Sequence, residues 1–263
     1  MLLRGPVAGL CLAAVLIACG GDNTTSAVPV AGAPAAPGTR ALDAGAALLQ
    51  DKPPIGAINA YLDGFHFYNG RMQAQTEAHH YCTILGEELI QCVIFDGNVQ
   101  DARLMGVKYI VSQRQFESLP EAEKTLWHSH VHEVKSGQLI AHGIPQAAEH
   151  GLMARLVGTY GKTWHTWHTD QGKGLPLGTP QLMMGFTADG QADAVMVQAR
   201  DERFGVSTQE RRASRADIPA PPIAPGANAW EQGVVVQIPD LTGAHAAMPA
   251  HEPPAASGTA GGS

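Results

Sequence analysis

Short stretches rich in β-branched and aromatic residues alternate along the chain with short helical patterns. Residues 76–85 and 88–95 are rich in β-forming residues and flank a turn near Gly86, which predicts a hairpin. Residues 103–111 predict a third strand, and shorter strands are expected at 162–168, 182–186 and 234–238. Residues 130–140 contain Lys135-Ser-Gly137, which predicts a strand, a turn and another strand.

Helices are predicted between these strands. Ser118-Leu-Pro-Glu121 has the form of a capping box with Pro in the first turn, so a helix is expected to run to about Leu126. Residues 145–157 carry apolar side chains at helical spacing, and residues 198–212 predict a helix with a break at Gly205. Hairpins mixed with helices predict an α+β fold: a single domain with a mainly antiparallel sheet and several short helices.

Composition confines the expected domain to the middle of the chain. All 15 Phe, Trp and Tyr residues lie between Tyr61 and Trp230. We therefore expect one domain at residues 54–240, a flexible tether at residues 19–53 and a disordered tail at residues 241–263, because the two ends are rich in small residues and Pro. The formal charge of −7 argues against a nucleic-acid partner, because phosphate binding needs a basic surface.

Residues 1–18 have the pattern of an export signal. Arg4 precedes an apolar run from Val7 to Ile17 that is too short to span a membrane. The run ends in Leu16-Ile17-Ala18-Cys19, which resembles a bacterial lipobox and makes Cys19 the predicted lipidation site. The alternative is an ordinary secretory signal with an incidental Cys. The first interpretation predicts a lipid-anchored protein of the bacterial cell envelope, attached to the outer membrane and facing the periplasm.

Several motifs follow one another in the order found in a known family. They are Gly64-Phe-His-Phe-Tyr68, Glu77-Ala-His-His-Tyr-Cys82, Leu126-Trp-His-Ser-His130, Glu133-Val-Lys-Ser-Gly137 and Leu175-Pro-Leu-Gly178. From about Pro54 to Ile238 the chain resembles the oil body-associated protein family, whose plant members are associated with lipid droplets. The resemblance implies a connection with a lipid surface and supplies no catalytic activity or cofactor. The candidate residues of the family pattern are His66, His79, Trp127, Glu133 and Trp164, whereas His132, His142 and His168 depart from it.

Cys82 and Cys92 lie symmetrically about residue 87, so they face each other in the predicted hairpin. Directly opposed Cβ atoms lie roughly 4.5 to 5.5 Å apart, close enough for a disulfide after a modest adjustment. His80 projects from the same face of its strand as Cys82. The alternative is therefore a metal site made by His80, Cys82 and Cys92. Buried reduced cysteines are a third interpretation.

Trp127-His-Ser-His-Val-His132 is a second concentration of histidines. On a strand, alternate residues of this motif share one face, and a His-x-His pair such as His128 and His130 commonly holds a divalent metal. Glu133 would serve as an orienting carboxylate. The alternative is a set of histidines that hydrogen-bond to buried polar groups beside a packed Trp127. Lone histidines such as His66 and His79 are interpreted as core residues.

Two functions remain after the common enzyme motifs are excluded. The chain contains no Gly-x-Ser-x-Gly motif, no phosphate-binding loop and no dinucleotide-binding fingerprint. The first interpretation is a membrane-anchored extracytoplasmic lipoprotein without catalytic activity, which binds a lipid or a protein. The second is a metal-binding protein or metalloenzyme that uses zinc or another divalent metal. Its candidate ligands are His80, Cys82, Cys92, His128 and His130.

Overall fold

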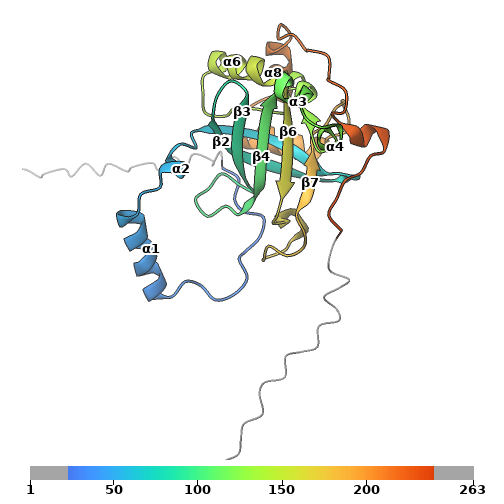
Figure 1. The fold of residues 1–263 in the computed structure, drawn as a ribbon. Helices are drawn as coiled ribbons and strands as arrows, with labels where there is room; N and C mark the ends of the chain where they lie inside the picture. The colour runs from blue at the N-terminus through green and yellow to red at the C-terminus, as the bar shows by residue number, and fades with distance from the viewer. Residues whose placement is uncertain (1–22, 240–263) are drawn as a thin grey trace, which may run out of the picture.

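Six antiparallel strands close into a barrel in the computed structural model, which describes residues 23–239 (Figure 1). The sheet order is β4-β3-β2-β1-β7-β6-β5, and pairing of β4 with β6 closes the barrel and leaves β5 attached to β6. The predicted antiparallel sheet in a single domain is confirmed, and the closure into a barrel is an addition to that prediction. The strands are β1 (Ala60–Tyr68), β2 (Arg71–Ile84), β3 (Leu89–Phe95), β4 (Leu104–Ser112), β5 (His128–Ser129), β6 (Thr159–His165) and β7 (Gln181–Met184).

The predicted hairpin is the β2–β3 pair. Its register sets Cys82 opposite Cys92 with a Cα–Cα distance of 4.0 Å, and the two residues form a disulfide. The disulfide prediction is confirmed. Consequently neither sulfur is available as a thiolate, and the expectation that Cys82 and Cys92 ligate a metal is wrong for this form of the protein.

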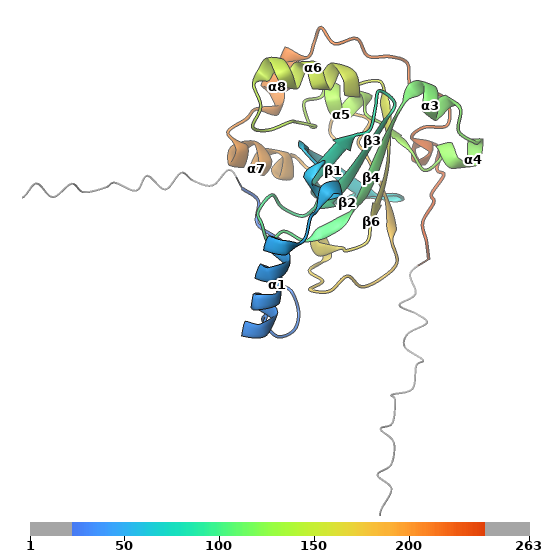
Figure 2. The same ribbon diagram turned by 60° about the vertical axis from the view of Figure 1, so that its left-hand side comes forward.

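Helices cover one end of the barrel, which we call the disulfide end because Leu62, Cys82 and Cys92 lie there. Met153 and Leu156 of α6 and Val134 of α5 pack against these residues and form the apolar core. Figure 2 shows α5, α6 and α8 gathered over this end. The helices are α1 (Pro37–Leu49), α2 (Pro53–Gly56), α3 (Gln113–Glu117), α4 (Glu121–Lys124), α5 (Val131–Lys135), α6 (Gln146–Leu156), α7 (Ala194–Phe204), α8 (Thr208–Ser214) and the 3-10 helices η1 (Thr169–Gln171) and η2 (Ala229–Gln232).

The helix predicted at residues 145–157 is confirmed by α6. The helix predicted at residues 198–212 with a break at Gly205 is confirmed by α7 and α8, which lie on either side of Gly205. Gly205 ends α7 with a φ of 59°, a left-handed conformation that glycine adopts without strain. The strand-turn-strand expected at residues 130–140 is wrong, because His130 precedes the short helix α5. The strand expected at 234–238 is also absent. The side chain of Gln237 instead pairs with the backbone N–H and C=O of Leu182, at 2.8 Å each, beyond the residues of β7 that pair with β1.

The expected tether is partly folded. Backbone N–H groups of Thr24 and Ala27 donate to Asn98 and Asp96, and Val28 is buried. Residues 37–49 form α1, none of whose residues is buried. The segment expected to be a flexible tether, residues 19–53, thus contains a part that contacts the domain and a helix, and its flexibility stays a prediction. The signal at 1–18, Cys19 and the tail at 241–263 lie outside the described residues. Within residues 23–239, no helix is both long and apolar enough to span a membrane.

Candidate metal centre

The barrel interior gathers five histidines. Their inward direction follows from the register, in which His66 pairs with Thr76, His80 with Leu62 and His165 with Gly106. All five side chains are buried, with at most 2% exposed surface. They come from separate parts of the chain: His66 from β1, His80 from β2, His128 from β5, His130 from the residue before α5, and His165 from β6.

His66 lies at the centre of this histidine cluster. Its ring centroid is 5.0 Å from that of His80, 5.9 Å from that of His128 and 5.5 Å from that of His165. The rings of His128 and His130 are 5.3 Å apart. The structure therefore brings His80, His128 and His130 together and adds His66 and His165, which the sequence alone did not join to them.

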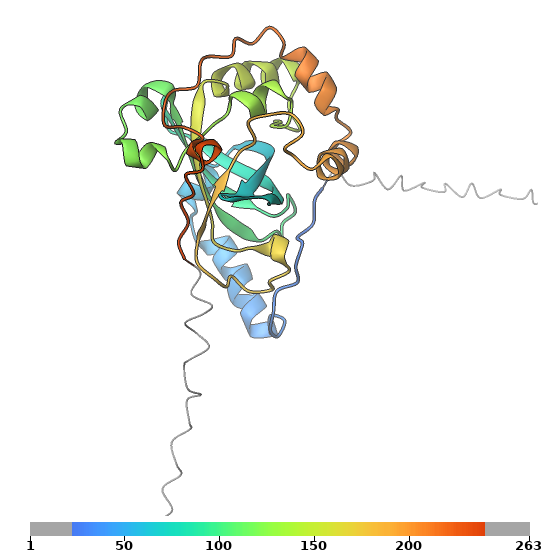
Figure 3. The ribbon, with the colours of Figure 1, turned by 90° about the vertical axis from the view of Figure 1, so that its right-hand side faces the viewer.

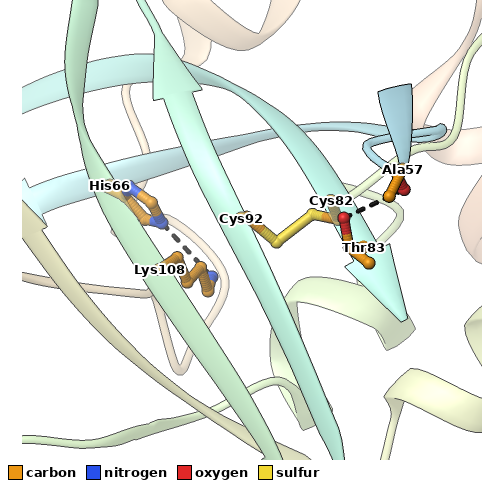
Figure 4. Close-up of a disulfide and its surroundings, with 6 residues drawn as sticks. All are labelled: Ala57, His66, Cys82, Thr83, Cys92 and Lys108. Carbon is orange, nitrogen blue, oxygen red and sulfur yellow. Dashed lines mark hydrogen bonds between the residues drawn. A yellow bond between two sulfur atoms is a disulfide. The ribbon is translucent and has the colours of Figure 1, made fainter. Parts of the chain in front are cut away.

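Most ring nitrogens of the cluster have no hydrogen-bond partner within residues 23–239. His130 is oriented by a 2.8 Å hydrogen bond between its Nδ1 and the Thr159 hydroxyl, which leaves Nε2 directed inward. His66 Nε2 lies 3.4 Å from Lys108 Nζ, and Figure 4 shows these two side chains beside the disulfide. The side chain of His80 hydrogen-bonds to the backbone of Leu62. Among the described residues, the other buried atoms of the cluster without a hydrogen-bond partner are His66 Nδ1, both ring nitrogens of His128 and His165, His130 Nε2 and Glu133 Oε2.

Glu133 supplies the carboxylate of the cluster from α5. Its Oε2 atom lies 3.9 Å from His128 Nε2 and 3.8 Å from His130 Nε2. Ligand atoms of His66, His128 and Glu133 all lie within 4.8 Å of one another. Two atoms bonded to one ion are about 3 to 4 Å apart, because each bond is about 2.1 Å long. Small rotamer shifts would therefore close this set around an ion.

The cluster is held in the form in which imidazole binds metals. Burial lowers the pKa of His66, His80, His128 and His130 well below the usual value, and the nearby Lys108 ammonium acts in the same direction. Burial lowers the pKa of His165 to about 3. The five rings are therefore neutral at pH 7, and a neutral ring nitrogen with a free lone pair is a metal ligand.

Two opposite charges accompany the histidines. Burial raises the pKa of the Glu133 carboxyl, whereas Lys108 opposes that effect. Burial lowers the pKa of Lys108, and Glu133 opposes that effect. Lys108 was not among the sequence candidates. The alternation in β4 could have identified it: Gly106, Lys108 and Ile110 are buried on one face of the strand, whereas Val107 and Tyr109 are exposed on the other.

Two glycines leave room for the side chains of the cluster. A Cβ at Gly161 would lie 2.6 Å from Lys108 Cε, 2.7 Å from His130 Nε2 and 2.9 Å from His128 Nε2. A Cβ at Gly185 would lie 2.9 Å from Glu133 Oε2. The interior is therefore packed tightly around the ring nitrogens. Next to them is a cavity of about 10 Å³, which His80, His130 and Lys108 line together with apolar side chains.

The remaining sequence candidates have structural positions. His79 faces away from the barrel interior, with Nδ1 2.8 Å from the Tyr61 hydroxyl and 3.2 Å from Asp63 Oδ2. Asp63 in turn accepts a 2.8 Å hydrogen bond from the buried Arg200. Asp63, Glu77 and His79 also lie close enough to hold an ion, but Arg200 and Arg203 already pair with the two carboxylates. Trp127 and Trp164 pack into apolar clusters on the outside of the barrel.

Known proteins similar to this chain are described as proteins of unknown function or as oil body-associated proteins of plants. Residues 52–219 match a family model described as a protein of unknown function, DUF1264. The chain is 42% identical to oil body-associated protein 1B of Arabidopsis thaliana over 219 residues, which cover 82% of this chain and 91% of the relative. It is 43% identical to oil body-associated protein 1A of Zea mays over 213 residues, covering 80% and 90%. No solved structure matches the chain.

These relatives correct the expected location. The lipobox pattern predicted a lipid-anchored protein of a bacterial outer membrane, but the similar proteins are oil body-associated proteins of plants, which are not lipoproteins of a bacterial envelope. The location predicted from residues 1–19 is therefore wrong. The likeness to these relatives extends over most of the chain, and the family resemblance inferred from the motifs is confirmed.

Proposed function

The chain belongs to the oil body-associated protein family, and on that premise we propose that its barrel binds one divalent transition-metal ion between His66, His128 and Glu133. One observation carries the proposal: six buried ring nitrogens, from His66, His128, His130 and His165, have no hydrogen-bond partner within residues 23–239. An unsatisfied buried polar group costs about 1 to 3 kcal/mol, so natural proteins rarely retain several together. A metal ion satisfies several lone pairs at one point.

The donor set defines the class of metal. Two imidazoles and one carboxylate suit manganese, iron, cobalt, nickel, copper or zinc in the divalent state. Calcium and magnesium prefer oxygen ligands throughout. His130 Nε2 lies 3.8 Å from the Glu133 carboxylate and is the nearest further donor. Three protein ligands leave a coordination position open, which is the arrangement of catalytic metal sites.

Electrostatics support a bound cation. Five neutral imidazoles add no positive charge. Burial raises the pKa of the Glu133 carboxyl, and a bound cation would favour its ionised form, which supplies one negative charge beside the rings. Lys108 is the only described cation in this group and lies against His66 Nε2. Because burial lowers the pKa of Lys108, its ammonium is more easily deprotonated than an exposed one, which reduces its repulsion toward an ion.

Metal analysis of the purified full chain tests the proposal. We expect about one ion per chain after loading with Zn²⁺, Mn²⁺ or Fe²⁺ and removal of unbound metal. His128→Gln and Glu133→Gln should each weaken binding by about 100-fold or more, since loss even of groups that only orient ligands costs 10- to 100-fold. His150→Gln is the matched control, because His150 lies on the surface of α6 and pairs with Asp217. Wild-type protein that binds none of these ions stoichiometrically would contradict the proposal.

A second candidate function is contact with a lipid surface. Its support is the name of the relatives, oil body-associated proteins, together with apolar side chains exposed on one side of the barrel. Leu175 and Leu177 lie between β6 and β7, and Val235 and Ile238 follow η2; between 43% and 57% of each side chain's surface is exposed. Sedimentation with phospholipid vesicles tests this candidate, and protein that stays in the supernatant with every vesicle composition would contradict it.

A further inference from the structure

A second cavity lies at the barrel end away from the disulfide. Tyr68 and His168 mark this end, which we call the Tyr68 end; their rings are 5.6 Å apart and their polar atoms 3.2 Å apart. A pocket of about 360 Å³ opens there between the β1–β2 turn, the loop before β7 and the segment after η2. The side chains that matter for its chemistry are Asn69, Arg71, Lys173, Thr179, Gln181 and Gln237.

Two cations of this pocket have no ion-pair partner among the described residues. The Arg71 guanidinium lies 4.9 Å from the centre of the Tyr68 ring and contacts no carboxylate. Lys173 Nζ projects toward the pocket wall at Gly178, where an added Cβ would be 3.9 Å away. No acidic side chain is among the described residues that line the pocket. Asp170, which follows His168 in the chain, accepts a 2.6 Å hydrogen bond from the Tyr68 hydroxyl. The pocket therefore carries a net positive charge in a chain whose formal charge is −7.

Asn69 adds a buried acceptor to the same pocket. Only 1% of its surface is exposed, and its Oδ1 atom has no hydrogen-bond partner within residues 23–239. Its Nδ2 atom is already used, since it donates to the Val236 carbonyl at 3.3 Å. A ligand for this pocket thus combines an anionic group with a hydrogen-bond donor, as a protonated phosphate oxygen or a hydroxyl next to a phosphate does.

Exposed apolar side chains belong to the segments that form the pocket. Leu175 and Leu177 belong to the loop that carries Lys173 and Gly178, and Val235 and Ile238 themselves line the pocket. Figures 1 and 3 show that this loop, the segment after η2 and the helix α1 lie on the same side of the molecule, away from α6 and α8. Leu42, Leu48 and Leu49 of α1 are at least 77% exposed. Cations framed by exposed apolar side chains are characteristic of proteins that lie on a lipid surface.

We infer that this pocket binds the phosphate head group of an anionic phospholipid while the surrounding apolar side chains enter the lipid layer. Arg71 and Lys173 pair with the phosphate, and Asn69 accepts a hydrogen bond from the head group. This inference rests on the second candidate function, contact with a lipid surface, and is independent of the metal centre. It specifies which lipid the surface must contain and which residues recognise it.

Vesicle sedimentation with the full chain tests the inference. The probes are vesicles of phosphatidylcholine alone and vesicles that also contain phosphatidic acid. The double variant Arg71→Gln with Lys173→Gln should bind the acidic vesicles about 30-fold more weakly than wild type, since each basic residue near an anionic surface contributes roughly a factor of five. The control carries the same charge change at Arg114→Gln with Arg155→Gln, because these exposed arginines lie on α3 and α6. The control should bind like wild type.

The possible outcomes distinguish failure of the head-group pocket from failure of the proposed contact with a lipid surface. Equal binding of both double variants to acidic vesicles, or wild-type binding that does not depend on phosphatidic acid, would overturn the head-group pocket while contact with lipid still holds. No binding to any vesicle would overturn both. Binding of glycerol 3-phosphate by calorimetry without vesicle binding would identify a soluble phosphate ester as the ligand and overturn the phospholipid. Metal content measured in the same samples should be unchanged by Arg71→Gln with Lys173→Gln.

Discussion

Mild acid should unfold the metal-free protein, because the barrel interior excludes protons from five histidines. In the unfolded chain each ring titrates near pH 6.5, whereas burial holds the folded pKa of His66, His80, His128 and His130 well below that value and that of His165 at about 3. As the pH falls below 6.5, the unfolded state therefore binds protons that the folded state does not. Stability is complete above pH 6.5 and is lost as the pH falls toward the folded pKa values.

The size of the effect follows from linkage. At pH 5.5, one pH unit below the unfolded pKa, each ring that stays neutral in the folded state costs about 1.4 kcal/mol. Five rings would cost about 7 kcal/mol. His79 lies outside the cluster, but burial also lowers its pKa, to about 4, so it adds about 1.4 kcal/mol. Burial raises the pKa of Glu133 and Asp63, so up to two protons bound by the folded state act in the opposite direction. Between pH 7.5 and pH 5.5 each such proton offsets up to about 2.7 kcal/mol. The expected loss is therefore about 3 to 8 kcal/mol, a large part of the about 5 to 15 kcal/mol that stabilises a typical domain.

Urea unfolding followed by circular dichroism, at pH 7.5 and pH 5.5 with a chelator present, measures this loss. His165→Leu removes one of the titrating rings and should reduce the difference between the two pH values by about 1.4 kcal/mol. His150→Leu is the control, because His150 lies at the surface and pairs with Asp217. An unfolding free energy that changes by less than about 1 kcal/mol between the two pH values would refute the argument that the cluster is buried in its neutral form.

Three further changes probe the same interior. Gly161→Ala should lower the free energy of unfolding by about 1 to 3 kcal/mol through overpacking and should weaken metal binding. The control Gly151→Ala, whose added Cβ has no atom near it, should raise the free energy of unfolding by about 0.5 to 1 kcal/mol. Thermal melts compare the two variants, and equal melting temperatures would contradict the tight packing around the ring nitrogens. Lys108→Met should strengthen Zn²⁺ binding at least about tenfold in a chelator competition by removing a nearby cation, and weaker binding would argue against an ion beside His66. Cys82→Ser with Cys92→Ser should cost about 2 to 3 kcal/mol in urea unfolding, as expected for a loop of ten residues, and no cost would show that the bond constrains little.

Local sequence patterns were sufficient to predict those elements whose structure depends on residues close together in the chain. The β2–β3 hairpin could be predicted because its turn is short and its strands are adjacent, and the same symmetry identified the disulfide. β1 could not be recognised in this way. Seven consecutive residues of β1, from Leu62 to Tyr68, are buried, because the outer face is covered by α7 while the inner face lines the barrel. A strand buried on both faces has no alternation of polar and apolar residues.

The candidate metal centre depends on contacts that no local pattern contains. His66 is separated by 62 positions from His128 and by 99 from His165, and only closure of the barrel through the β4–β6 pairing brings these rings together. When a polar residue next to aromatic residues is considered alone, its pattern is that of a core residue whose hydrogen bonds are all made. His66 was interpreted as such a core residue. The distinction lies in the partners: His79 has Tyr61 and Asp63 within hydrogen-bond range, whereas His66 faces other imidazoles and a lysine. Two adjacent histidines, His79 and His80, thus point to opposite faces of β2, and only the inward one belongs to a group whose nitrogens require a ligand.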